Sequence, residues 1–265
     1  MKKDYVVAIP SYKRPNTLKT KTLRLLEHYK IDPKKVTIFV ANEEEKQLYA
    51  EALADTPYTN LVVGVPGMGA IRRFIQQYYP EGEYVMQFDD DIQQFLRKLD
   101  DRTRMPQVDD LEAEVIIRGF EACERNEAYM FGIYAASNKL FLKHRISVGL
   151  YYCVGSCWGV INRKDKAFSV TLDDKEDFER TLQHYVHDGK VVRIDNITLL
   201  SKYYTEGGGM QETRTADRVR SGAEYLVAKY PDLCKIYTRK SSNLAELRLR
   251  DTVRKTNRVS SEALV

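Results

Sequence analysis

The chain has few cysteines and no long apolar run, so it does not have the features of a disulfide-stabilised protein or of a membrane protein. It contains four cysteines in 265 residues, and none has the Cys-x-x-Cys spacing of zinc or thiol–disulfide sites. No apolar run approaches the roughly 20 residues that a membrane span needs. The first residues lead into a strand-like segment rather than into a signal peptide. We therefore expect a protein of the reducing cytoplasm without a membrane partner.

Charge is almost balanced, but its distribution is uneven. The formal net charge is +4, and residues 235–265 hold eight basic and three acidic residues, so this segment carries +5 and the remainder about −1. A basic segment on a nearly neutral body fits a polyanionic partner such as nucleic acid, or a solvated surface that aids solubility. We expect one domain over residues 1–240 and a basic C-terminal tail over 241–265, helical or disordered.

Strand and helix patterns alternate through the first third of the chain. Short apolar runs cover residues 5–10, 36–41, 61–65 and 84–88, and helical spacing covers 16–30, with Asn16 as its cap, 43–54 and 69–79. The less regular second half predicts helices over 109–126 and 174–188 and strands over 129–135, 151–161 and 191–200. The fold class is therefore α/β, a mostly parallel sheet flanked by helices with ligands at the carboxyl ends of its strands.

Three consecutive carboxylates, Asp89, Asp90 and Asp91, follow the apolar run at residues 84–88. Charges are costly to bury unless they are paired or bind a metal. The spacing of Asp89 and Asp91 suits a hard divalent cation that also contacts phosphate oxygens. A solvated acidic turn that caps the next helix is the alternative.

Distinctive loops leave the earlier strands. The first contains Pro10, Ser11, Tyr12 and Arg14, where Tyr12 can stack on a base and Arg14 can meet a phosphate. It can also be a simple lead-in to a helix. Asn42 follows the second strand. If the sheet is parallel, these loops, the glycine loop of the third strand and the three aspartates meet at one edge.

The third strand is followed by Gly67 and Gly69, a spacing that lets backbone amides approach phosphates. A dinucleotide fingerprint would need a small residue at position 72, which is arginine, so we disfavour a nicotinamide site. Arg72 and Arg73 instead fit neutralisation of a diphosphate, with plain surface charge as the alternative.

The Glu176-Asp177 pair begins a helix, where acids are favoured by the helix dipole without any function. A carboxylate at such a position can also act as a general base toward an acceptor hydroxyl, and we prefer Asp177 to Glu176. His184 and His187 share a helix face, but no third metal ligand is evident. The loop at 207–209 is a mobile lid, a close approach to substrate or a plain flexible loop.

Together these segments resemble the GT-A glycosyltransferases. Within that superfamily the chain is most similar to the phage enzymes associated with thymine or cytosine dioxygenases (TET/JBP-associated), which glycosylate hydroxymethylated pyrimidines in DNA. The resemblance covers residues 5–230 and rests on Pro-Ser-Tyr-Lys-Arg at 10–14, Gly-Met-Gly-Ala-Ile-Arg-Arg at 67–73, Phe-Asp-Asp-Asp-Ile at 88–92, Glu-Asp-Phe at 176–178 and Tyr-Tyr-x-x-Gly-Gly-Gly at 203–209.

The resemblance implies a nucleotide-sugar half over residues 1–100 and an acceptor half over 101–240. Asp89 and Asp91 would hold Mn²⁺ or Mg²⁺ against the diphosphate of UDP-glucose or another UDP-sugar, and Asp177 or Glu176 would be the base. The expected donor-binding residues are Pro10, Ser11, Tyr12, Arg14, Asn42, Gly67, Gly69, Arg72, Arg73 and Asp90. Many GT-A enzymes use a late histidine on the metal, but residues 201–205 read Ser-Lys-Tyr-Tyr-Thr.

The acceptor implied by the resemblance is DNA containing hydroxymethylated pyrimidines, in the cytoplasm of a phage-infected bacterium. A base inside a duplex has to be flipped out to react, and Tyr151, Tyr152 and Trp158 are candidates to stack on it or fill the gap, unless they lie in a buried strand. The alternatives are a GT-A transferase for a glycan or small molecule, a nucleotidyltransferase, and a DNA-binding module without catalysis.

Overall fold

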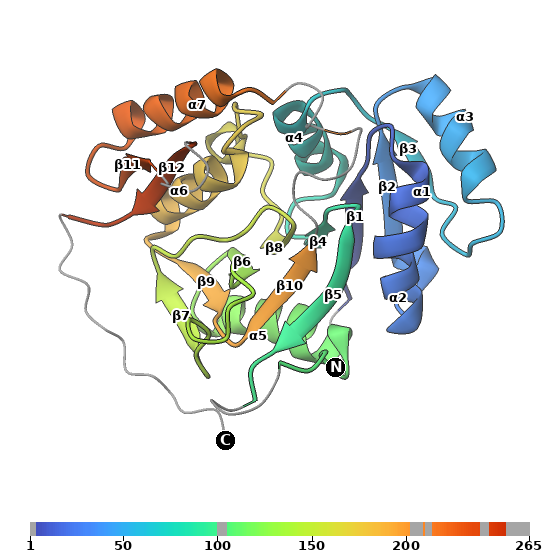
Figure 1. The fold of residues 1–265 in the computed structure, drawn as a ribbon, viewed down its shortest axis with the longest axis horizontal. Coiled ribbons are helices and arrows are strands. Elements are labelled where there is room, and N and C mark those ends of the chain that lie inside the picture. The colour runs from blue at the N-terminus through green and yellow to red at the C-terminus, as the bar shows by residue number, and fades with distance from the viewer. Residues whose placement is uncertain (1–3, 100–104, 202–208, 210–213, 239–243, 253–265) are drawn as a thin grey trace.

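The computed structural model describes residues 4–99, 105–201, 209, 214–238 and 244–252 (Figure 1). The strands are β1 (Val6–Pro10), β2 (Val36–Val40), β3 (Leu61–Val63), β4 (Tyr84–Phe88), β5 (Ile92–Arg97), β6 (Met130–Ile133), β7 (Ile146–Gly149), β8 (Cys157–Ile161), β9 (Val191–Ile194), β10 (Ile197–Ser201), β11 (Cys234–Thr238) and β12 (Ala245–Leu249). The α-helices are α1 (Pro15–Leu18), α2 (Arg24–His28), α3 (Glu43–Ala52), α4 (Met68–Tyr78), α5 (Arg118–Arg125), α6 (Glu176–Asp188) and α7 (Ala216–Lys229).

The main sheet has eight strands in the order β3-β2-β1-β4-β8-β6-β9-β7. Strands β1, β2, β3 and β4 are parallel, and β6 and β9 run in the same direction, whereas β7 and β8 are antiparallel to their neighbours. The predicted α/β class with a mostly parallel, helix-flanked sheet is thus confirmed, as is the shared edge at the carboxyl ends of the first four strands. We call this edge, which β6 and β9 also reach, the carboxyl rim.

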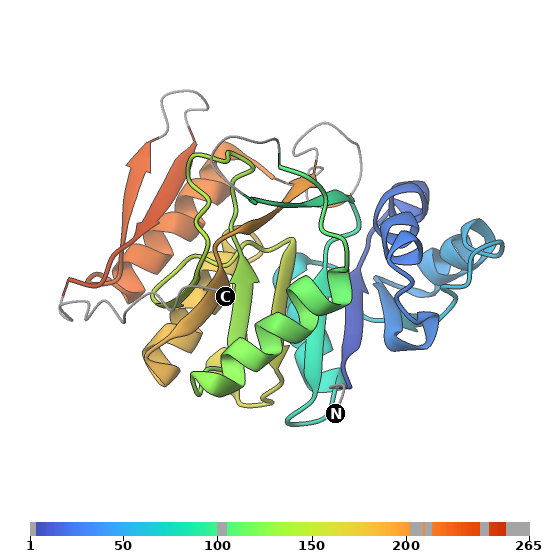
Figure 2. The same ribbon diagram turned by 90° about the horizontal axis from the view of Figure 1, so that it is seen from below.

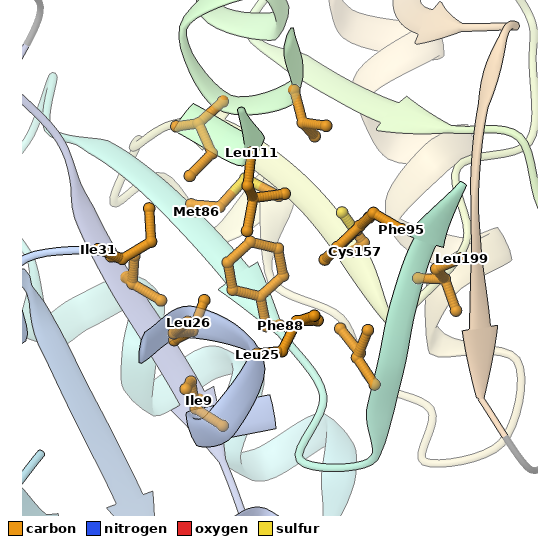
Figure 3. Packing of buried hydrophobic residues seen from close by; sticks show 14 of the residues in the cluster. Ile9, Leu25, Leu26, Ile31, Met86, Phe88, Phe95, Leu111, Cys157 and Leu199 are labelled. Atoms are coloured by element: carbon orange, nitrogen blue, oxygen red, sulfur yellow. The ribbon is translucent and has the colours of Figure 1, made fainter. Parts of the chain in front are cut away.

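Apolar side chains alternate between the two faces of the sheet, as strand geometry requires. On β1, Ile9 faces a core formed with helices α1, α2, α3 and α5, whereas Ala8 faces a second core under α4. Figure 3 shows the first core, where Ile9, Met86 and Phe88 of the sheet pack against Leu26 of α2. Both faces of β2 are covered, and all five of its residues are buried.

Helix α6 begins at the carboxyl rim and ends at Gly189, whose φ of +73° is the left-handed conformation that terminates helices at glycine. Phe178 and Leu182 of α6 pack against Ala223 and Leu226 of α7 in a third core. The β11–β12 hairpin completes that core, and Figure 1 shows it beside α7, at the end of the molecule opposite α1 and α3.

A two-stranded antiparallel ribbon, β5 paired with β10, crosses over the main sheet (Figure 2). β5 starts directly after Asp91, and its first residue, Ile92, pairs with Ser201, the last residue of β10. The other end of the ribbon pairs Arg97 with Ile197. The ribbon therefore leads from the aspartates to the region that follows β6 and β9.

Several predicted elements were wrong in detail. The strand expected over 151–161 is only β8, because residues 151–156 are irregular; the strand expected over 191–200 is two strands, β9 and β10, separated by a turn. The helix expected over 16–30 starts at Pro15 and includes a π-helical turn at Lys19–Leu23, so Asn16 is not its cap. The segment after 241, expected to be helical or disordered, contains strand β12.

Candidate functional site

The three aspartates form a fixed turn between β4 and β5. Thr22 of the first helical segment secures it: its Oγ1 donates to the carbonyl of Asp89 at 2.8 Å and accepts from the amide of Ile92 at 3.0 Å. The turn directs the three carboxylates differently. Asp90 points inward and is 1% exposed, whereas the side chains of Asp89 and Asp91 remain 25% and 14% exposed. Only the outer pair is accessible to a ligand.

Asp90 joins the β4 turn to the loop after β1. Its carboxylate accepts from Ser11 Oγ at 2.6 Å and from Nε and Nη2 of Arg14 at 3.2 and 2.5 Å. Burial raises the pKa of Asp90 to about 7, although Arg14 opposes that shift. Sequence reasoning placed Ser11, Arg14 and Asp90 at the donor site, and the structure brings all three together, with Asp90 holding the other two in position.

Asp89 and Asp91 suit a divalent cation. Burial, and then the neighbouring charge of Asp89, raise the pKa of Asp91, so a bound cation would relieve a repulsion that the turn imposes. Two carboxylates leave coordination positions for phosphate oxygens and water, which hard cations prefer. Within the described residues there is no group of three or more histidine, cysteine, aspartate or glutamate side chains arranged to hold a metal. Residues 202–205, where a late ligand was sought, lie outside the described residues.

A buried ion-pair chain connects Asp89 to the start of α6. Arg72 of α4 donates to Asp89 Oδ1 at 2.8 Å and lies 3.6 Å from Oε1 of Glu176. Arg180, one helical turn further along α6, donates to Oε2 of Glu176 at 2.5 Å and lies over the ring of Trp158 at 3.7 Å. Arg72, Glu176 and Arg180 are all buried, so each charge depends on its neighbours in the chain.

Glu176 and Asp177 have different environments, although they are adjacent. Burial raises the pKa of Glu176, and both oxygens of its carboxylate face arginines. Asp177 is half-buried, accepts from the hydroxyl of Tyr152 through Oδ2 and also accepts from the amide of Phe178 through Oδ1 at 2.9 Å. Asp177 is therefore the carboxylate of the pair that retains partial access to solvent.

Gly155 and Ser156, which precede β8, lie between the aspartate turn and α6. The carbonyl of Ser156 accepts from the amide of Asp89 at 3.0 Å, and that of Gly155 accepts from Arg72 at 3.3 Å. A Cβ atom on Gly155 would lie 3.5 Å from Oδ2 of Asp177. Asp89 and Asp177 thus both lie next to this two-residue segment.

Residues around the first loop also hold it in shape. The hydroxyl of Tyr49, on α3, lies 2.7 Å from Ser11 Oγ and accepts from the amide of Arg14 at 3.0 Å. Tyr12 is half-buried, and its carbonyl accepts from the amide of Gly209 at 3.1 Å. Gly209 packs on Arg14, because a Cβ atom there would lie 2.9 Å from Cζ of Arg14. The other residues of the expected glycine loop, 207, 208 and 210, lie outside the described residues.

Other predicted donor residues also have partners within the chain. Asn42 accepts from the amide of Glu45 at 2.9 Å and so caps α3. The amide of Gly69 donates to Oδ1 of Asp173 at 2.9 Å, which places a carboxylate of this chain at the start of α4, where we expected a phosphate. Arg73 donates to the carbonyl of Val170 at 2.6 Å. Pro10 and Gly67 lie at the carboxyl rim, at the end of β1 and at the start of α4.

Sequence reasoning missed Tyr49, Asp173 and Arg180. Arg180 had a signal, since it stands four residues after Glu176 on a predicted helix, the spacing of a helical ion pair. The roles of Tyr49 and Asp173 depend on contacts across long stretches of chain, 38 residues from Ser11 and 104 from Gly69, and no local pattern shows them.

The aromatic and histidine residues that we considered as functional candidates in the second half of the chain contact other residues of the chain. Trp158 is buried, Tyr152 stacks on Phe178 at 4.2 Å, and the guanidinium of Arg193 lies over the half-buried Tyr151 at 4.9 Å. His184 is buried with Nδ1 at 3.0 Å from the carbonyl of Arg180, whereas His187 is exposed. Trp158 and His184 are thus core residues, whereas Tyr151 and His187 retain access to solvent.

The comparisons with known proteins found similarity to solved structures alone. The chain matches no family model and no curated protein. Forty-six chains of solved structures match. One is the crystal structure of residues 1–349 of TarS from S. aureus, with a TM-score of 0.46 and 15% identity over 85% of this chain; this chain spans 66% of the length of that one. Within the described residues no helix has the length and apolar character of a membrane span. We therefore base the function on the site itself.

Proposed function

We propose that the chain is a metal-dependent glycosyltransferase that moves a sugar from a nucleotide-sugar donor to a hydroxyl acceptor. The observation that carries this proposal is that a turn with two accessible carboxylates, Asp89 and Asp91, is bound through Asp89 to the Gly155–Ser156 segment, next to which lies the separate half-buried carboxylate of Asp177. Transfer from a nucleoside diphosphate needs one acidic site to hold a cation on the diphosphate and another to accept a proton.

Asp177 is the proposed general base. It takes the proton of the acceptor hydroxyl while the hydroxyl oxygen forms a bond to the anomeric carbon. The bond from that carbon to the diphosphate breaks, and its electron pair leaves with the nucleoside diphosphate. A base on the face of the sugar opposite the leaving group implies inversion at the anomeric carbon. Glu176 is a weaker candidate, because its carboxylate is engaged by Arg72 and Arg180.

Asp89 and Asp91 are the proposed metal ligands, and Mn²⁺ or Mg²⁺ bound there would neutralise the charge that develops on the leaving diphosphate. The nucleoside would lie along the rim between β1 and β3, where Tyr12 is half-buried beside Arg14. Arg14 contacts Asp90 and lies 3.9 Å from Asp91, so it is placed to orient the metal-binding turn. UDP-glucose or another UDP-sugar is the donor class that we propose.

For the acceptor, we propose the hydroxymethyl group of a modified pyrimidine in DNA. The net charge of +4 and the excess of basic residues over 235–265 are compatible with a polyanionic substrate. The half of the sheet beyond β8 borders the side of the site away from β1–β3, so an acceptor approaching Asp177 would meet residues of that half.

The test incubates the protein with Mn²⁺, a panel of UDP-sugars and duplex DNA that contains 5-hydroxymethylcytosine or 5-hydroxymethyluracil. The DNA is then digested, and its nucleosides are analysed by mass spectrometry. We expect one modified nucleoside to gain the mass of a sugar. Asp91→Asn should abolish that gain, whereas Asp232→Asn, an exposed carboxylate before β11, should not affect it.

Hydrolysis of a UDP-sugar that depends on metal and on Asp91, without transfer to DNA, would support the donor chemistry and contradict the DNA acceptor. Neither transfer nor hydrolysis with any UDP-sugar would contradict the proposed donor class. Full activity of Asp91→Asn would exclude the proposed metal site.

A further inference from the structure

The loop between β6 and β7, residues 136–145, exposes an unusual set of side chains at the carboxyl rim. Leu140 and Phe141 are 77% and 57% exposed, the highest values among the large apolar residues that the structure describes. Lys139, Lys143 and His144 are exposed beside them. We call this segment the β6–β7 loop. An aromatic ring flanked by cations is the combination that single-stranded nucleic acids bind.

The β6–β7 loop has a defined conformation that turns these side chains outward. The side-chain oxygen of Asn138 accepts from the amide of Leu140 at 3.0 Å, and its carbonyl accepts from the amide of Phe141 at 3.1 Å. Leu142 is buried, and its carbonyl accepts from Nζ of Lys98, at the end of β5, at 3.0 Å. With Leu142 anchored inward, the two preceding side chains are held at the surface.

The β6–β7 loop and the three aspartates lie near opposite ends of the β5–β10 ribbon. Ile92, beside Asp91, and Arg97, beside Lys98, are the two ends of β5. Five steps of about 3.3 Å place these ends about 16 Å apart. The two regions also share the carboxyl rim, because β6 runs parallel to β4. Figure 2 shows the yellow-green segment after β6 on the same side of the sheet as the ribbon.

The chain segment that contains the loop carries positive charge only. No aspartate or glutamate occurs in residues 128–164, within which the loop lies. Asp195, whose carbonyl accepts from the amide of Lys143 at 3.1 Å, is buried and paired with Arg145 and Arg193 at 3.0 and 2.7 Å. Lys139 and Lys143 have no carboxylate partner among the described residues. Both side chains are exposed.

We propose that the β6–β7 loop binds the nucleic acid strand that carries the reacting nucleotide. This inference rests on the proposed function, because that function supplies the DNA acceptor. Lys139 and Lys143 contact phosphates, and Phe141 stacks on an unpaired base or a sugar. Two apolar side chains on a short loop are too few for a membrane-inserting surface, which needs an extended apolar face.

The test measures binding apart from catalysis. Fluorescence anisotropy with a labelled 20-nucleotide single strand, at several salt concentrations, compares the wild type with Lys139→Ala/Lys143→Ala and with Phe141→Ser. Loss of two phosphate contacts should reduce the slope of log affinity against log salt by about 1.4. Phe141→Ser should weaken binding about tenfold and leave that slope unchanged, because stacking releases no counterions.

The matched control is Lys164→Ala/Lys166→Ala, which removes two exposed lysines after β8, at the opposite edge of the sheet. It should leave binding unchanged, and Val186→Ser, an exposed apolar residue of α6, controls for Phe141→Ser. Equal losses in the control, an unchanged slope in the loop variant, or binding only to vesicles of phosphatidylglycerol and phosphatidylcholine would overturn the inference. DNA binding that depends on the loop but occurs without sugar transfer would support it and contradict the proposed reaction.

Discussion

Nη2 of Arg72 lies 2.8 Å from Oδ1 of Asp89, so a buried side chain of α4 is bound to the carboxylate turn after β4. The same guanidinium lies 3.6 Å from Glu176, which immediately precedes the proposed base. We infer that Arg72 positions both acidic sites and does not reach the diphosphate, because its side chain is only 3% exposed. A residue expected to bind the donor is therefore better explained as support for the site.

Replacement of Arg72 should destabilise the fold. Among the described residues, Arg72→Met would leave the buried Glu176 with one ion-pair partner and Asp89 with none, and losing one member of a buried ion pair costs about 3 kcal/mol. Urea unfolding followed by circular dichroism measures this change. Arg73→Met is the matched control: Arg73 is half-buried with one hydrogen bond to a carbonyl, so we expect about 1 kcal/mol. Equal losses in the two variants would contradict the role of the ion-pair chain.

Replacements of the two acids at the start of α6 should have different effects. Replacing Asp177 should slow the reaction, and replacing Glu176 should destabilise the fold. Asp177→Asn removes the proposed base, so the rate of transfer at saturating substrate should fall on the order of 100- to 10,000-fold. Its melting temperature should change little, because Asp177 is half-buried, makes no salt bridge with the residues that the structure describes, and asparagine can still accept from the hydroxyl of Tyr152. Glu176→Gln leaves the buried Arg180 without a charged partner and should cost about 3 kcal/mol of stability.

The measurements for this pair are single-turnover rates and thermal unfolding of both variants under the same conditions. If Glu176→Gln lost more activity than Asp177→Asn while remaining folded, the assignment of the base would be reversed. Asp232→Asn again serves as the exposed carboxylate control.

The sequence predicted the parallel half of the sheet because its strands are short apolar runs separated by periodic helices. Buried strands such as β2 leave that pattern even without tertiary information. Strands β5 and β7 were missed because they carry polar residues, as in Gln93 and Gln94 of β5, and the apolar run at 191–200 concealed a turn at Asp195. These strands are defined by their pairing partners more than by their composition.

The residues of the candidate site could also be predicted only in part from the sequence. Asp89, Asp91 and Asp177 were identified because carboxylates at strand and helix ends are visible in the sequence. The sequence does not show that the three consecutive aspartates differ in exposure, because burial decides this difference. Asp90 is enclosed by Ser11 and Arg14, which are 79 and 76 residues away. The occupation of the start of α4 by Asp173 likewise depends on a contact across 104 residues.

His184 should make stability depend on pH. Burial lowers its pKa to about 3, so the imidazole stays neutral in the folded protein, while in the unfolded chain it takes up a proton below about pH 6.5. Stability from this group is therefore complete above pH 6.5 and is lost as the pH falls toward 3. Between pH 7 and 5 the loss should amount to about 2 kcal/mol.

The comparison that isolates this effect is urea unfolding of the wild type, His184→Gln and His187→Gln at pH 7 and pH 5. Asp90 titrates in the same range, since its pKa is about 7, but it is present in all three proteins and cancels in the difference. His184→Gln should lose about 2 kcal/mol less than the wild type over this interval. His187 is exposed, so His187→Gln should follow the wild type. The prediction would be contradicted if the wild type and His184→Gln lost the same free energy of unfolding between pH 7 and pH 5. That result would mean that His184 takes up a proton as readily in the folded protein as in the unfolded chain. Its burial, and the charges of Arg163 and Arg180, oppose such protonation.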